Sequence, residues 1–358
     1  MVILKSRFDA PRFALVAIAV ASLASLSCKP DVAGRASLVD VPRVLAISAS
    51  PAEAEEGDTV TYSALIVDPS GAPSSAPSDW ALCTARKPLA LIEPVNPICL
   101  ARTGEFLVAL GQGNKVTGAI PKDACRLFGP EVPPPKAGEP DGRPTDPDST
   151  GGYYQPLRVL ITRADGDYAT LGASRIACGV AGASSGDVAA MKARYHYNAL
   201  PVIAAVTANG APLGRDVASA TPVAAGDTVH FEVSWPACPM VDTCGDGICG
   251  PDETRATCKA DCAKPTNTSV GCGGAERYVA YDVESQSVAV RREQMRASWF
   301  TTAGALSVDA SGRDEGDSTP NAANDLSLAG VAGPVFGWVV LTDSRGGTTW
   351  TTFALNAQ

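Results

Sequence analysis

Residues 57–67 read Gly-Asp-Thr-Val-Thr-Tyr-Ser-Ala-Leu-Ile-Val, a turn followed by a run in which apolar residues alternate with small or polar ones. Successive side chains of a strand point to opposite faces, so this pattern predicts a half-buried β-strand. Residues 43–51 alternate in the same way and stop at Pro51, which indicates a preceding edge strand. A Gly-Asp turn between two such strands predicts the start of an antiparallel sheet.

A second copy of this turn and strand occurs later in the chain. Residues 225–229 read Ala-Gly-Asp-Thr-Val and match the Glu-Gly-Asp-Thr-Val of residues 56–60, which indicates a repeated module. Aromatic residues make up only 6% of the 358 residues, whereas there are 34 glycines and 28 prolines, a composition that favours short strands joined by many turns. We therefore predict an all-β chain of two antiparallel β-sandwich domains, residues 42–198 and 199–358.

Further strands are expected from the same alternation. In the first domain they cover residues 79–83, 105–110, 156–163 and 174–180, and in the second 201–210, 225–235, 277–281, 287–291, 296–302, 335–341 and 348–355. A short helix is predicted over 187–195. Residues 129–152 are dominated by Pro, Gly and Asp, so we predict an exposed loop there.

These segments resemble bacterial immunoglobulin-like modules, whose first strands carry the Gly-Asp-Thr-Val-Thr pattern of residues 57–61. The resemblance implies that Trp80, on the third strand, lies near the core. The last predicted hairpin has Asp343-Ser-Arg-Gly-Gly347 at its tip and resembles polycystic-kidney-disease-like modules of bacterial surface proteins. Both resemblances imply an extracellular or envelope protein.

The N-terminus has the layout of an export signal. Lys5, Arg7 and Arg12 precede an uncharged run, residues 13–27, that is shorter than the roughly twenty residues that span a bilayer. The run ends at Cys28, and without Cys28 the odd total of eleven cysteines becomes an even one. This resembles bacterial lipoprotein precursors, which usually have Leu where Ser25 stands. We predict a signal peptide over 1–27 and a lipidated Cys28 opening a flexible stalk, 28–41; secretion without lipid, after cleavage at Ala24 or Ser27, is the alternative.

The formal net charge of −9 argues against nucleic acid as a partner and against electrostatic binding to anionic headgroups. Membrane contact would then come from the lipid on Cys28 alone. The expected location is the outer membrane, facing either the periplasm or the cell surface.

A cysteine-rich insert, residues 238–272, interrupts the second domain. With few apolar side chains it cannot be held by a hydrophobic core, so crosslinks or a metal must hold it. It resembles a Cys-Gly-Asp-Gly-x-Cys repeat of secreted bacterial proteins, but has Arg255 where many copies have another cysteine. We expect disulfides at the ten remaining cysteines, which are Cys83, Cys99, Cys125, Cys178, Cys238, Cys244, Cys249, Cys258, Cys262 and Cys272. The expected pairing brackets the insert with Cys238 and Cys272 and pairs the first four cysteines among themselves.

Calcium is the alternative to a disulfide-only insert. If Asp242 is position 1 of an EF-hand loop, Asp246 falls at position 5 and Glu253 at position 12. Position 3 is Cys244, which offers no oxygen ligand. We therefore expect no cofactor; the alternative is a calcium ion bound by Asp242, Asp246 and Glu253.

A hydrolase is a further alternative. Residues 182–186 read Gly-Ala-Ser-Ser-Gly, the nucleophile-elbow pattern, and His196 and His230 are the only histidines. That motif needs a strand leading into a helix of a parallel sheet, whereas the surrounding patterns are antiparallel. We predict no enzyme activity.

Taken as a whole, the chain resembles predicted cell-surface lipoproteins of Gram-negative bacteria. The resemblance implies a non-catalytic envelope protein that binds, adheres or scaffolds, with an unknown protein or polysaccharide as partner. The alternatives are a carbohydrate-binding module using Tyr153 and Tyr154, or a serine hydrolase using Ser184.

Overall fold

The computed structural model describes residues 36–72, 74, 78–86, 95–130, 150, 152–216, 218–262 and 271–358. The predicted signal peptide, Cys28 and most of the predicted loop 129–152 lie outside these residues. None of the described helices is long and apolar enough to cross a membrane.

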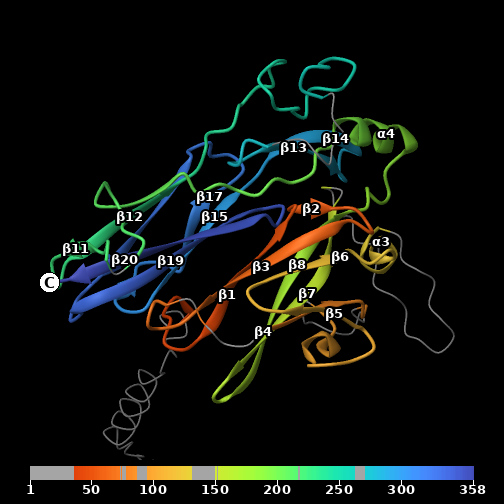
Figure 1. The fold of residues 1–358 in the computed structure, drawn as a ribbon. Coiled ribbons are helices and arrows are strands. Elements are labelled where there is room, and N and C mark those ends of the chain that lie inside the picture. Colours follow the sequence, from red (N-terminus) through yellow and green to blue (C-terminus); the bar gives the residue numbers. More distant parts are fainter. Residues whose placement is uncertain are drawn as a thin grey trace, which may run out of the picture.

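The first module is a sandwich of two sheets (Figure 1). Its strands are β1 (Arg43–Ser50), β2 (Glu53–Ala54), β3 (Thr59–Val67), β4 (Ser78–Cys83), β5 (Leu107–Gln112), β6 (Lys115–Ala119), β7 (Gly152–Arg163) and β8 (Gly166–Ala177). One sheet has the order β1-β3-β6 and the other β2-β8-β7-β4-β5. The core between them contains Val60 and Tyr62 of β3 and Trp80 and Leu82 of β4, so Trp80 lies where the resemblance implied.

The second module repeats this design. Its strands are β9 (Ala205–Ala208), β10 (Ala211–Pro212), β11 (Thr221–Val223), β12 (Thr228–Ser234), β15 (Met295–Thr301), β16 (Ala305–Leu306), β17 (Ala310–Arg313), β18 (Asn321–Ser327), β19 (Gly333–Asp343) and β20 (Thr348–Ala357). The sheets have the orders β10-β9-β12-β18-β16 and β11-β20-β19-β15-β17. Aromatic rings fill the core, where Phe231 lies 5.8 Å from Trp299 and 4.9 Å from Phe353 between ring centroids.

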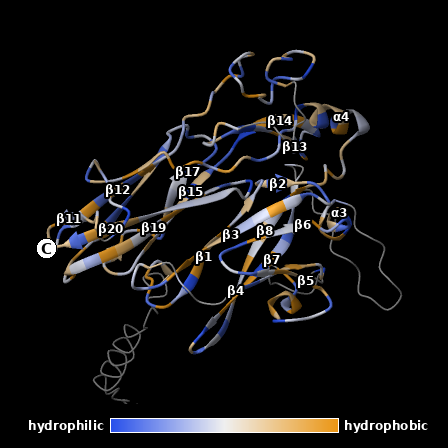
Figure 2. Ribbon diagram, viewed as in Figure 1, coloured by the Kyte–Doolittle hydropathy of each residue, from blue (hydrophilic) through white to orange (hydrophobic). Residues whose placement is uncertain are grey.

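The two modules share their strand order. β1-β3-β6 corresponds to β9-β12-β18, and β2-β8-β7-β4-β5 corresponds to β11-β20-β19-β15-β17. In both modules one short strand, β2 or β11, pairs in parallel with the last strand, while the other ladders are antiparallel. Along the strands, hydrophobic and hydrophilic residues alternate, as expected for sheets with one buried face (Figure 2). The predicted all-β fold of two immunoglobulin-like sandwiches is therefore confirmed.

Several elements differ from the sequence prediction. Residues 277–281 and 287–291 were expected to be strands of the second sandwich, but β13 (Arg277–Asp282) and β14 (Ser287–Arg292) form a separate two-stranded sheet. This hairpin packs on α4 (Ser185–Arg194), which replaces the predicted helix 187–195. The strand β18 was not predicted, because Asn-Ala-Ala-Asn-Asp-Leu-Ser is too small and polar to reveal its inward face. The strand β6 and the short strands β16 and β17 were not predicted either.

The remaining elements are the helix α3 (Ala124–Phe128) and the 3-10 helix η1 (Pro97–Leu100), both in connections of the first module. The insert follows β12 and lies beyond the β13–β14 hairpin and α4, drawn in teal at the top of Figure 1. It therefore occupies the loop between the second and third principal strands of the second module.

The modules pack side by side through one face of each. Leu65 and Val67 of β3 join Trp338 and Val340 of β19 in an apolar cluster that also includes Val39. Val39 is buried, and its N–H donates to the carbonyl of Thr301 at 2.8 Å. The prediction of a flexible stalk as far as residue 41 is thus wrong for its last residues, since burial of Val39 outweighs the entropy of a free tether.

Candidate functional site

Ser184, the serine of the nucleophile-elbow pattern, caps α4. Its hydroxyl accepts a hydrogen bond from the Asp187 N–H at 3.2 Å and donates to the Asp187 carboxylate at 2.5 Å. Small polar residues are favoured at this position because they satisfy N–H groups that the first helical turn leaves open. The pattern therefore encodes a helix start between the two modules.

The histidines lie elsewhere. His230 is on β12, where its Nδ1 is 2.8 Å from the Asp325 carboxylate on the exposed face of β18. His196 lies in the connection that follows α4, and burial lowers the pKa of its imidazole. Among the described residues, no hydrogen bond joins Ser184 to a histidine. The geometry thus supplies no serine–histidine pair in this state.

A deeply buried polar site joins the modules, and the sequence did not reveal it. We call it the junction cluster; its members are Glu53, Arg175, Tyr195, Asn198, Glu276, Glu293, Asp343 and Arg345. Glu53 of β2 lies 3.1 Å from Arg175 Nε and 3.1 Å from Arg345 Nη2. Arg345, in the β19–β20 turn, also lies 3.6 Å from Glu293. One carboxylate of the first module is thereby shared by an arginine from each module.

Residues after α4 complete the cluster. The Tyr195 hydroxyl donates to Glu53, and the Asn198 N–H donates to the same carboxylate at 2.9 Å. The Asn198 side-chain amide donates to Asp343 at 3.1 Å. Arg345 also donates to the His196 carbonyl at 2.7 Å. The connection between the modules is therefore fixed from both sides.

The cluster holds more acids than bases, and its pKa values follow from this imbalance. Within the part of the chain that the structure describes, the cations that act on Glu53, Glu276, Glu293 and Asp343 are Arg175 and Arg345. Burial is the largest single influence on Glu53 and by itself would raise its pKa, but the two guanidinium groups and the hydrogen bonds from Tyr195 and Asn198 together outweigh it, so the pKa lies below its usual value.

The pKa values of the other three acids of the cluster are raised instead. Burial raises the pKa of Glu276 and Glu293, and it raises the pKa of Asp343 to about 6. Burial also raises the pKa of Tyr195 to about 12, so its phenol stays a hydrogen-bond donor. Burial in the junction cluster therefore disfavours the charged form of these three acids.

The insert is held by local crosslinks. Cys238 pairs with Cys272 and so closes the insert at its base, while Cys244 pairs with Cys258 and Cys249 with Cys262. In the first module, Cys83 pairs with Cys99 and Cys125 with Cys178. Five disulfides indicate that the chain folds in an oxidising, extracytoplasmic compartment.

The acids of the insert hydrogen-bond to backbone N–H groups. Asp261 accepts from Gly245 at 2.5 Å and from Gly247 at 3.1 Å, so it fixes the Cys-Gly-Asp-Gly turn from the far end of the motif. Asp246 accepts from the N–H of Ile248, two residues on, at 2.8 Å. These hydrogen bonds satisfy backbone N–H groups of the motif locally, as a loop without a hydrophobic core requires.

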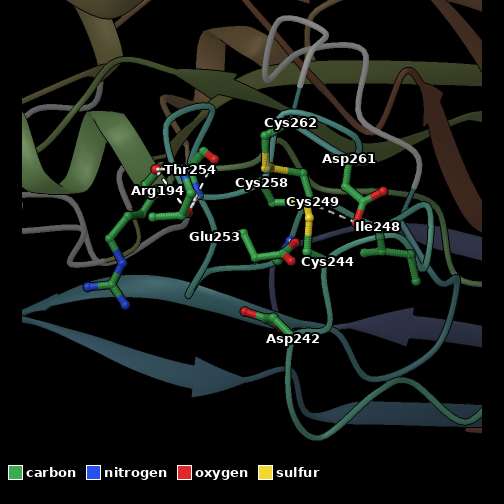
Figure 3. The surroundings of a disulfide bond; sticks show 12 residues. Arg194, Asp242, Cys244, Ile248, Cys249, Glu253, Thr254, Cys258, Asp261 and Cys262 are labelled. Carbon is green, nitrogen blue, oxygen red and sulfur yellow. Dashed lines mark hydrogen bonds between the residues drawn. A yellow bond between two sulfur atoms is a disulfide. The ribbon is translucent and has the colours of Figure 1, made fainter.

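The three residues proposed for calcium are placed as follows. Asp242 pairs with Arg277 at 2.9 Å, and Glu253 accepts from the Gly250 N–H at 3.2 Å. Glu253 lies with Asp261 and disulfide sulfurs, whereas Asp242 and Asp246 belong to neither carboxylate–sulfur group of the described residues. Figure 3 shows Glu253 beside the two disulfides and Asp242 below them. The EF-hand spacing is therefore present in the sequence but does not gather the three carboxylates.

Two surface features bear on binding. Met240 and Val241, in the first loop of the insert, are 56% and 72% exposed, the latter the highest value among the exposed large apolar residues described. Tyr153 is buried in the core of the first module, and the Tyr154 hydroxyl donates to the Arg345 carbonyl at 3.2 Å. These two rings therefore do not form a shared flat platform for a sugar.

A small cavity separates the insert from the junction cluster. His196, Asp242, Gly250, Glu276 and Arg345 line it, and its volume of about 40 Å³ suits an ordered water rather than a larger ligand.

Comparisons with known proteins add little to this description. No family model and no curated protein matches the chain. Fibronectin(III)-like modules of CbhA from Clostridium thermocellum match with 9% identity, cover 87% of this chain and 94% of theirs, and have a TM-score of 0.21. The adhesin InvE of Yersinia pseudotuberculosis matches with 9% identity over 87% of this chain and 58% of its own, also with a TM-score of 0.21. At such scores the sandwich assignment rests on the strand order and the shared core.

Proposed function

We propose that this chain is a non-catalytic envelope lipoprotein that binds a partner at the cell surface. The observation that carries the proposal is that the polar groups most suggestive of chemistry have structural partners: Ser184 caps a helix and the insert acids hold backbone turns. A protein that commits such groups to structure is suited to display loops on a rigid body.

The contact surface in this proposal is the first loop of the insert. Met240 and Val241 are exposed on a segment closed at its base by the Cys238–Cys272 disulfide. Apolar side chains held on a crosslinked loop lose little entropy on binding, which favours a protein partner with an apolar pocket. The junction cluster supports the proposal because it fixes the second module, which carries the insert, against the first.

Photo-crosslinking on intact cells tests this surface. A photoreactive amino acid at position 241 should give a discrete adduct, whereas the same group at Val308, a 46% exposed residue elsewhere on the second module, should not. Equal labelling from both positions, or none from position 241, would contradict the proposed surface.

The anchor is tested separately. A fatty-acid analogue should label the wild-type chain and fail to label the Cys28→Ala variant. Labelling that persists in the variant would remove lipidation at Cys28 while leaving the binding surface open to its own test.

A further inference from the structure

A cavity of about 340 Å³ lies between α4 and the end of β8 in the first module. β8 ends at Ala177, and the next residue, Cys178, is tied to α3 by its disulfide with Cys125. The chain turns at Gly179, whose φ of 82° favours glycine, and then leads into α4 (Figure 1). The volume falls within the range of about 300–1,000 Å³ that is usual for small-ligand sites.

Contacts behind the cavity hold its wall in place. Met191 of α4 and Tyr195, which follows α4, both line the cavity, and they pack with Val279 and Tyr281 of β13. The Tyr195 hydroxyl donates to Glu53 in the junction cluster. A wall that is already ordered loses little entropy when a ligand binds against it, so the site is preformed.

The lining combines an apolar surface with one charged group of each sign. Val180, Val188 and Met191 supply the apolar surface. Glu55, in the connection that follows β2, supplies a carboxylate, and Lys192 of α4 supplies an ammonium group. The cavity can therefore contact apolar, cationic and anionic parts of one ligand.

Neither charge is neutralised by another described residue. Glu55 accepts a hydrogen bond from the Tyr197 hydroxyl, which also lines the cavity, but Glu55 has no ion pair in the described part of the chain. Lys192 likewise has no ion pair there, and the two groups do not pair with each other. A ligand that satisfies both groups must carry a positive and a negative charge at separate places.

We infer that this cavity binds a small zwitterion with an apolar body, which is the chemistry of a free apolar α-amino acid. The ammonium group of the ligand pairs with Glu55 and its carboxylate pairs with Lys192, while its side chain packs on Val188 and Met191. Because Glu55 and Lys192 are exposed, each pair contributes modestly, and selectivity comes from the requirement for both charges. The site lies apart from the insert and adds small-molecule binding to the surface proposed there.

Calorimetric titration of the full chain with L-phenylalanine and two analogues tests the site. N-acetyl-L-phenylalanine lacks the ammonium group and L-phenylalanine amide lacks the carboxylate, so each should bind about fivefold more weakly than L-phenylalanine. No binding of L-phenylalanine at millimolar concentration, or equal affinity for all three compounds, would overturn the inference.

Matched variants assign the two contacts. Lys192→Gln should no longer distinguish L-phenylalanine from its amide, and Glu55→Gln should no longer distinguish it from the N-acetyl analogue. Lys122→Gln changes an exposed lysine outside the cavity and should keep both distinctions. Because compounds are compared within one variant, a general loss of stability cannot produce this pattern. Discrimination that persists in Lys192→Gln and in Glu55→Gln would place the ligand elsewhere and overturn the inference.

Discussion

The junction cluster and the insert are both polar and both ordered, but by opposite means. The junction cluster gathers side chains as far apart in the chain as Glu53 and Arg345, and burial makes their ion pairs strong and their separation costly. The insert instead pairs residues that are close in the sequence, such as Asp261 with Gly247 and Cys249 with Cys262. The difference implies that damage to the junction is felt by both modules, whereas damage to the insert stays local.

The largest effect is expected from Arg345→Met. This change leaves Glu53 and Glu293 without a shared buried cation, and removal of one partner from a buried ion pair costs about 3–5 kcal/mol. We expect that loss in the free energy of unfolding, measured by urea denaturation. The control Arg126→Met breaks the exposed pair with Asp123 and should cost under about 1 kcal/mol. Equal losses would mean that the junction does not couple the modules.

The second prediction concerns the insert alone. Replacing Cys249 and Cys262 together by Ser removes a crosslink with a sequence separation of 13, which the loop-entropy relation values at about 3 kcal/mol. Because the effect is local, residues 244–258 should exchange amide hydrogens faster while the main unfolding transition keeps its midpoint. A large fall in that midpoint would show that the insert supports the modules.

The third prediction uses pH to separate the two regions. The pKa of Asp343 is raised to about 6 by burial, above its ordinary value of 3.8. The stability that it contributes is therefore fully present below about pH 3.8 and is lost as pH rises through 6. Glu276 and Glu293 act in the same direction because burial also raises the pKa of each.

The difference between the unfolding free energies measured at pH 5 and at pH 7.5 gives the contribution of these buried acids. Asp343→Asn should flatten the dependence seen in the wild-type chain, whereas the insert variant should retain it. If the unfolding free energy of Asp343→Asn changed between pH 5 and pH 7.5 as much as that of the wild-type chain, the pH dependence would come from other groups.

The smallest effect is expected at α4, which lies between the two regions. Ser184→Ala removes the cap of α4 and should cost about 1 kcal/mol in thermal or chemical unfolding. Ser184→Thr keeps an oxygen in place and should cost less. A stability unchanged by Ser184→Ala would remove the capping role and reopen the question of what this serine does.

The sequence predicted the strands whose residues alternate strongly, such as β3 and β12, and the turn that repeats before each. It missed β18, whose Asn324 points inward as a polar residue, and it assigned β13 and β14 to the wrong sheet. Alternation reports that one face of a strand is buried, but it does not report which neighbour buries it. The same limit explains the missed junction cluster, since Arg175 and Arg345 appear in the sequence as ordinary charges in a strand and a turn.

By itself, then, the sequence determined the all-β class, the two modules and the need for crosslinks in the insert, because periodicity, turn chemistry and scarcity of apolar residues are local properties. Tertiary structure alone decided that Val39 docks on the second module, that Glu53 is shared between two arginines, and that the spacing of Asp242, Asp246 and Glu253 does not form one cluster. These outcomes depend on which surfaces meet in space, and burial and charge pairing between distant residues have no signature in the order of the chain.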